Sequence, residues 1–141
     1  MPPPSYSAIE TERAGNHVLL TRMRGHVTRA LAQGQFEQFR VILAATPSPG
    51  WIIELGEMTG FDPGAVSAGA LWFSAFKDRG GERVVFVSAS SAVRMVAASL
   101  AFAVHAKIAS YDTLKDAYEA VGLGNVEPRP SLLAFPPTKA G

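Results

Sequence analysis

The chain contains no cysteine, which excludes a disulfide framework, a thiolate metal site and a cysteine nucleophile. Charged residues make up 18% of its 141 residues, below the roughly 25% that is usual for globular domains, so part of the surface should be apolar. The 13 basic and 12 acidic side chains nearly cancel, which leaves no electrostatic footprint for nucleic acid or an anionic membrane. We therefore expect no nucleic-acid partner.

Long hydrophobic runs are also absent. The most apolar stretch, residues 93–106, is interrupted by Arg94, Ser99 and His105, and it is shorter than the roughly 20 residues of a membrane-spanning helix. Residues 1–5 (MPPPS) lack the basic and apolar regions of a signal peptide. Both observations predict a cytoplasmic protein without membrane insertion.

Prolines divide the chain into three parts. Seven of the ten lie near the ends, at positions 2–4 and between residues 128 and 137. Hydrophobic residues make up 48% of the sequence, which is ample for one packed core. We predict a flexible N-terminus over residues 1–5, one domain over residues 6–122 and a proline-rich tail over residues 123–141.

Short β-branched and aromatic runs alternate with longer stretches of helical period, as in a mixed sheet flanked by helices. Strands are predicted over residues 6–12, 17–24, 51–55, 83–88 and 106–110, and helices over 28–45, 63–79, 91–104 and 113–122. This α/β fold has the order β-β-α-β-α-β-α-β-α. The first two strands should pair antiparallel around a turn at residues 14–16, and residues 51–55 should lie at the centre of the sheet.

Helix starts are marked by capping residues. Asp62 precedes Pro63, which suits a first helical turn, so Asp62 should be an N-cap. Ser90 or Ser91, and then Asp112, should cap the next two helices. Asp62 also has a functional interpretation, because ligands and partners often dock where strands lead into helices. Trp51 and Trp72 are expected in the core.

No catalytic constellation is present in the sequence. It contains no glycine-rich phosphate loop with its lysine, no histidine pair at metal-ligand spacing and no G-x-S-x-G nucleophile turn. His17, His26 and His105 lie far apart and are assigned no role. We therefore predict that the protein is not an enzyme and has no metal or other cofactor.

Two helix faces carry apolar residues where solvent is expected. On the helix after Asp62, Leu71 falls between Ser67 and Ser74 on the outer stripe. In the helix over residues 91–104, Val93, Val96, Ala97, Leu100 and Val104 form the core-facing arc. Behind that arc, Met95, Ala98 and Phe102 form a second stripe that a partner protein, a second copy of the chain or residues 132–135 should cover.

The sequence also resembles a known family. The similar segments are residues 51–55 (WIIEL), 60–62 (GFD), 80–87 (GGERVVFV), 92–94 (AVR) and 111–117 (YDTLKDA), within residues 17–121. Together they resemble the STAS domain, a family that includes the bacterial anti-sigma factor antagonists and the cytoplasmic tails of sulfate transporters. The resemblance implies a mixed sheet flanked by helices, a signalling role without catalysis, and phosphorylation on a Ser or Thr just after the Asp.

This chain departs from that pattern at the phosphorylation site. Asp62 matches the family's Asp, but Pro63 and Gly64 stand where the family has D-S-S or D-S-T, and Ser67 is the nearest hydroxyl. We therefore expect a constitutive module that binds a regulatory kinase, an anti-sigma factor or a scaffold. Its binding surface is predicted at Asp62, Pro63, Gly64, Ser67, Leu71 and Ser74, with Met95 and Phe102 as the alternative.

A second function is open, because some domains of similar fold carry a small molecule or lipid between the sheet and its helices. The small residues Ala97, Ala98 and Ala101 predict close packing of their helix, which favours the interaction module.

Overall fold

The computed structural model describes residues 7–15, 17–45 and 48–124. The predicted flexible N-terminus over residues 1–5 and all but residues 123 and 124 of the predicted tail lie outside the described residues. The elements are β1 (Ala8–Gly15), β2 (Val18–Val27), α1 (Arg29–Ala45), β3 (Gly50–Phe61), α2 (Pro63–Asp78), β4 (Arg83–Val87), α3 (Ser91–Ala103), β5 (Lys107–Tyr111) and α4 (Leu114–Ala120). The predicted order of strands and helices is confirmed.

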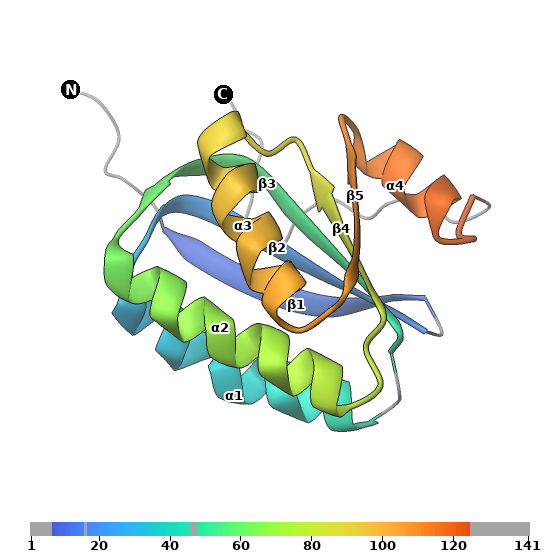
Figure 1. Ribbon diagram of the computed structural model, residues 1–141, viewed down its shortest axis with the longest axis horizontal. Coiled ribbons are helices and arrows are strands. Elements are labelled where there is room, and N and C mark those ends of the chain that lie inside the picture. The colour runs from blue at the N-terminus through green and yellow to red at the C-terminus, as the bar shows by residue number, and fades with distance from the viewer. Residues whose placement is uncertain (1–6, 16, 46–47, 125–141) are drawn as a thin grey trace, which may run out of the picture.

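The five strands form one sheet in the order β1-β2-β3-β4-β5, so neighbours in the sheet are neighbours in the chain (Figure 1). β1 and β2 pair antiparallel, as predicted, and all other pairs are parallel. Residues 51–55 lie in the central strand, also as predicted. The prediction that this strand ends at Leu55 was wrong, because β2 continues to Val27 and offers β3 a partner as far as Phe61.

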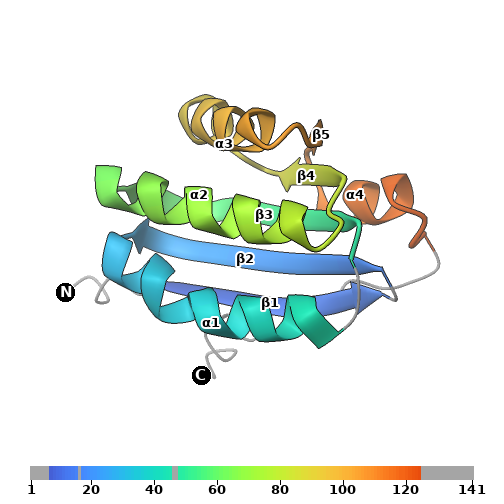
Figure 2. The same ribbon diagram turned by 60° about the horizontal axis from the view of Figure 1, so that its bottom comes forward.

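Helices cover both faces of the sheet (Figures 1 and 2). On one face, buried residues of α1, α2 and α3 share a core with those of the sheet, including Ala32, Phe39, Trp72, Phe76 and Ala101. On the other face, Ala117 and Tyr118 of α4 pack against Val18, Leu20, Ile52, Val85 and Val87. The fold is therefore a three-layer α/β arrangement.

Aromatic rings fill the space between α1, α2 and β3. The Phe39 ring stacks on Trp72 with centroids 4.6 Å apart, and the Trp51 ring lies 4.9 Å from Phe73 and 5.1 Å from Phe76. Both indole N–H groups are satisfied: Trp51 Nε1 donates to Thr21 Oγ1 at 2.8 Å, and Trp72 Nε1 donates to the Ala32 carbonyl at 3.2 Å. The prediction that both tryptophans are core residues is confirmed, since neither exceeds 3% exposure.

Side chains cap the helix starts. Asp62 Oδ1 accepts from the Ala65 N–H at 2.9 Å, and Ser90 Oγ accepts from the Val93 N–H at 3.3 Å, as predicted. The prediction of Asp112 as the cap of the last helix was wrong by one residue. Thr113 is extended, with φ −129°, and its hydroxyl accepts from the Asp116 N–H at 3.1 Å, so it is the residue that satisfies a free amide.

Candidate functional site

The Asp62 turn lies at the end of β3, where the chain enters α2. The Asp62 carboxylate is half-buried and accepts the Ala65 N–H, while Pro63 is exposed as the first helical residue. A proline suits this position because its missing N–H would have no intrahelical partner. Helix capping therefore accounts for both residues.

Gly64, the next residue, lies against the start of α1. A Cβ atom at this position would stand 2.9 Å from Arg29 Cβ and 3.0 Å from Arg29 Cδ. Real Cβ atoms are almost never that close, so any larger residue would push Arg29 aside. The close approach of α1 to α2 explains why the turn carries a glycine where the family pattern has a hydroxyl.

The outer face of α2 continues from this turn. Ser67, Leu71 and Ser74 are all exposed, and Leu71 exposes 55% of its surface. The structure thus brings the six residues of the predicted binding surface onto one turn and one helix face. Whether that surface binds a partner remains a prediction.

α3 exposes more apolar surface than α2 does. Met95 is 71% exposed and Phe102 is 74% exposed, whereas Val93 and Ala101 on the same helix are buried. Residues seven apart lie on the same side of a helix, so Met95 and Phe102 form one stripe directed away from the sheet. Residues 132–135, one of the covers considered for it, lie outside the described residues.

An apolar cavity of about 90 Å³ lies beneath α3. Its walls are Val66 and Gly69 of α2 together with Val93, Val96, Ala97 and Leu100 of α3, and its floor is formed by the sheet. The prediction of close packing around Ala97 was therefore wrong. Ala101 is fully buried against the core, but Val96, Ala97, Leu100 and Val104 stay only half-buried.

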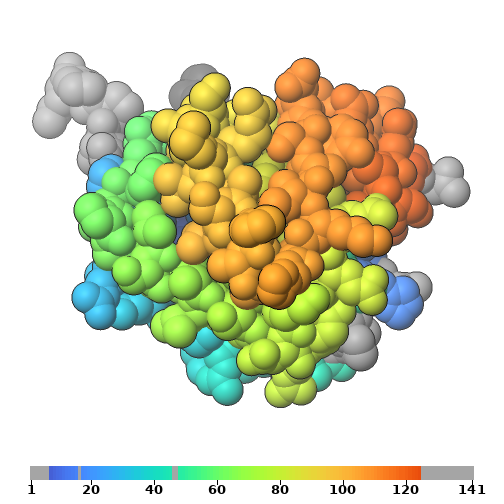
Figure 3. Space-filling view, viewed as in Figure 1, coloured from blue at the N-terminus to red at the C-terminus, as the bar shows by residue number. Residues whose placement is uncertain are grey.

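The cavity is open to solvent at one side. Figure 3 shows a hollow between α2, in green, and α3, in gold, with blue atoms of the N-terminal strands visible in its depth. Every lining residue is apolar or glycine, and the only side-chain nitrogen or oxygen atoms among them are the two indole nitrogens. Since both indole N–H groups already donate to protein oxygens, the lining has no side-chain donor left for a ligand.

A row of charged residues crosses the opposite face of the sheet. Glu10, Arg22 and Glu54 are register partners on β1, β2 and β3. Arg22 Nε lies 3.9 Å from Glu10 Oε2 and 3.6 Å from Glu54 Oε1. Burial raises the pKa of Glu54 above its usual value of 4.5, while the charge of Arg22 opposes this rise.

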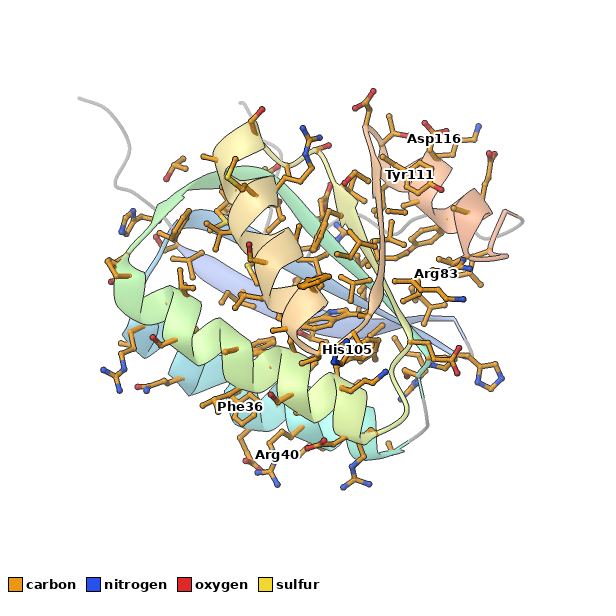
Figure 4. The ribbon with its side chains drawn as sticks, in the orientation of Figure 1. Phe36, Arg40, Arg83, His105, Tyr111 and Asp116 are labelled. Carbon is orange, nitrogen blue, oxygen red and sulfur yellow. The ribbon has the colours of Figure 1, made fainter. Side chains whose placement is uncertain are left out.

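The sequence-based predictions did not include this row, although Glu54 inside the apolar run 51–55 was a signal for it. Other polar side chains are dispersed: Figure 4 shows Arg83, Tyr111 and Asp116 on the α4 side and His105 at the end of α3. Within residues 7–124 as described, no group of three metal-ligating side chains comes together. No helix in that part of the chain is long and apolar enough to cross a membrane.

No family model and no curated protein matches the sequence. Solved structures do match. The Bacillus cell fate determinant SpoIIAA in its phosphorylated form is 13% identical, with a TM-score of 0.63 over 81% of this chain and 99% of that one. An anti-sigma factor antagonist of Mycobacterium paratuberculosis is 18% identical, with a TM-score of 0.60 over 86% and 98%.

A protein of Shewanella loihica with a SpoIIAA-like fold is 15% identical, with a TM-score of 0.63 over 85% of this chain and 97% of that one. These chains are aligned almost completely, and their strands and helices follow the order seen here. The fold predicted from the sequence, a STAS-like domain, is confirmed.

Proposed function

We propose that this STAS-like chain is a cytoplasmic regulatory module that acts by binding a protein partner and not by catalysis. The observation that carries the proposal is the exposed stripe of Met95 and Phe102 on α3. Large apolar side chains on the outer face of a helix are normally covered, and Met95 and Phe102 are left exposed by the described residues. The fold supports the proposal because SpoIIAA and the Mycobacterium paratuberculosis protein, which have similar structures, are both described as anti-sigma factor antagonists.

The partner is therefore expected to be an anti-sigma factor, a regulatory kinase or a scaffold that presents an apolar surface. The competing docking surface is the Asp62 turn together with the outer face of α2. That surface exposes one large apolar residue, Leu71, whereas α3 exposes two, Met95 and Phe102. A second copy of the chain is the other candidate occupant of either surface.

Three matched variants test the proposal. Phe102→Glu, Leu71→Glu and Val41→Glu each place a charge at an exposed apolar position on a different helix, so each should change stability by less than about 0.5 kcal/mol. Proteins retained from cell extract by the parent and by Val41→Glu, but lost with Phe102→Glu, identify partners of α3. Their affinity should fall by about 1–3 kcal/mol in titration calorimetry.

Loss with Leu71→Glu alone would move the site to α2. Partners retained equally by all three variants would refute both surfaces. Light scattering of the purified chain at rising concentration separates self-association from binding of a different protein.

We further propose that partner binding is constitutive. Pro63 and Gly64 occupy the positions that carry hydroxyls in the family pattern, and at Gly64 a larger side chain would have to displace Arg29. After incubation with ATP and a serine kinase of the family type, mass spectrometry should find residues 62–66 unmodified. Phosphate on Ser67, which is exposed on the outer face of α2, would instead establish a shifted switch.

The alternative function, carriage of a small apolar molecule or lipid, is favoured by one observation, the cavity beneath α3. Solvent extraction of protein purified from its native cells, followed by mass spectrometry, tests it directly. A stoichiometric apolar ligand is the expected result for a carrier, and a protein partner without ligand is the expected result for a module.

A further inference from the structure

We infer that the cavity between the sheet, α2 and α3 is a binding site for a single unbranched hydrocarbon chain, which enters between the two helices. This inference rests on the alternative function above and deepens it by naming the ligand chemistry and the entrance. It is independent of partner binding on the outer side of α3.

The chemistry of the lining selects an apolar ligand. A buried water molecule needs two to four polar partners, and a cavity needs only roughly 10–15 Å³ to hold one. This cavity is large enough for water at about 90 Å³, but its side chains offer no free donor and only the weak thioether acceptors of Met23 and Met58. Water is therefore poorly stabilised there, and an apolar group loses no hydrogen bond by replacing it.

The size of the cavity selects a narrow ligand. Its volume of about 90 Å³ is below the roughly 150 Å³ of an engineered apolar cavity that binds benzene. A fused ring system such as a sterol is too bulky, whereas an alkyl chain a few carbons long fits. Any polar head group has to remain outside, because the lining carries no charged side chain.

The seam between α2 and α3 is the entrance. A Cβ atom at Gly69 would stand 3.2 Å from Leu100 Cδ1, so the two helices touch through the tip of a flexible side chain. Of the α3 residues that line the cavity, only Val93 is buried, and Val96, Ala97 and Leu100 are half-buried. Rotation of Leu100 widens this opening without breaking a hydrogen bond.

The two tryptophans of the chain report on the site, because both line it. Titration with 1-alkanols of four to twelve carbons should change the tryptophan fluorescence in a saturable way. The dissociation constant should fall about four-fold with each added methylene, the equivalent of about 0.8 kcal/mol, and should level off once the cavity is full. The ligand should also raise the thermal midpoint of unfolding, because it binds only the folded chain.

Filling the cavity should abolish binding. Ala97→Phe on α3 and Val66→Phe on α2 each place a ring in the space, and we expect octanol affinity to fall ten-fold or more. Ala103→Phe is the matched control, because Ala103 is exposed on α3 and does not line the cavity. Thermal unfolding establishes that each variant is folded, and Val66→Phe carries the test if Ala97→Phe does not fold.

Incubation with phosphatidylcholine vesicles, followed by gel filtration and lipid extraction, distinguishes the source of the chain. Lipid recovered with the parent but not with the filled variants identifies an acyl chain, and octanol binding without recovered lipid identifies a free small ligand. No fluorescence or thermal response up to the solubility limit, or equal affinity in parent and filled variants, would overturn the inference. Phe102→Glu should bind octanol as the parent does, so failure of the partner surface is detected separately.

Discussion

α2 and α3 lie on the same face of the same sheet and have similar lengths, 16 and 13 residues, but they pack differently. α2 buries Trp72, Phe73 and Phe76 among the rings of Phe39 and Trp51. On α3 only Val93 and Ala101 are buried, and its single aromatic residue, Phe102, is 74% exposed.

The difference shows that side-chain size determines how completely each helix fills the space above the sheet. Large rings fill the space between α1, α2 and β3 and anchor those elements. Small side chains on α3 leave an unfilled volume inside, while its large ones stay available outside. We therefore expect the α1–α2 region to contribute most of the stability, and the proposed binding sites both lie at α3.

The largest expected effect comes from removing a ring beneath α2. Trp72→Ala should lower the free energy of unfolding by about 3–5 kcal/mol, the usual loss for a buried aromatic residue. Leu100→Ala on α3 should cost only about 1–2 kcal/mol, because Leu100 is half-buried beside an existing cavity. Urea denaturation measures both, and equal losses would break the contrast between the helices.

A smaller effect compares two glycines on α2. Gly64 faces α1, where a Cβ would meet Arg29 Cβ at 2.9 Å, and Gly69 faces α3, where it would meet only the Leu100 methyl at 3.2 Å. Gly64→Ala should lower the free energy of unfolding by about 1–2 kcal/mol, because overpacking outweighs the helix propensity of alanine. Gly69→Ala should raise it by up to about 1 kcal/mol, because Leu100 can shift into the cavity.

Urea denaturation curves of Gly64→Ala and Gly69→Ala measure both changes in stability. A loss of stability in Gly69→Ala similar to that in Gly64→Ala would mean that the α2–α3 seam is as rigid as the α1–α2 seam, and the entrance assigned to it would lose its support.

The two regions also differ in how far the sequence could predict them. Periodicity and capping residues were enough to predict the order of strands and helices along the chain, the N-cap at Asp62 and the buried positions of Trp51 and Trp72. The same periodicity indicates which side of α3 faces inward, but not how closely that side packs. The packing depends on contacts between distant residues such as Leu100 and Gly69, and for this reason the cavity was not predicted. The row of Glu10, Arg22 and Glu54 depends on the register in which β1, β2 and β3 pair. That register cannot be read from the sequence of any one strand.

The smallest expected effect is a change in stability with pH that arises from Glu54. It should not alter the difference in stability contribution between α2 and α3. Burial raises the pKa of Glu54, so between pH 4.5 and that raised value the folded state holds more protons than the unfolded state. The contribution of Glu54 to stability therefore falls as pH rises through this window. Urea midpoints of the parent relative to Glu54→Gln should show this fall. The loss caused by Trp72→Ala should be the same throughout, because Trp72 lies on the other face of the sheet.

The chain-order arrangement of the sheet has a consequence for how the protein is made. Because each strand pairs with its predecessor, β1, β2, α1 and β3 have their partners before α3 and β5 leave the ribosome. Every parallel pair closes over a single crossover helix, which keeps the loop-closure entropy of each step low. The aromatic core between α1, α2 and β3 can then form first, and the loosely packed α3 is added to a platform that already exists.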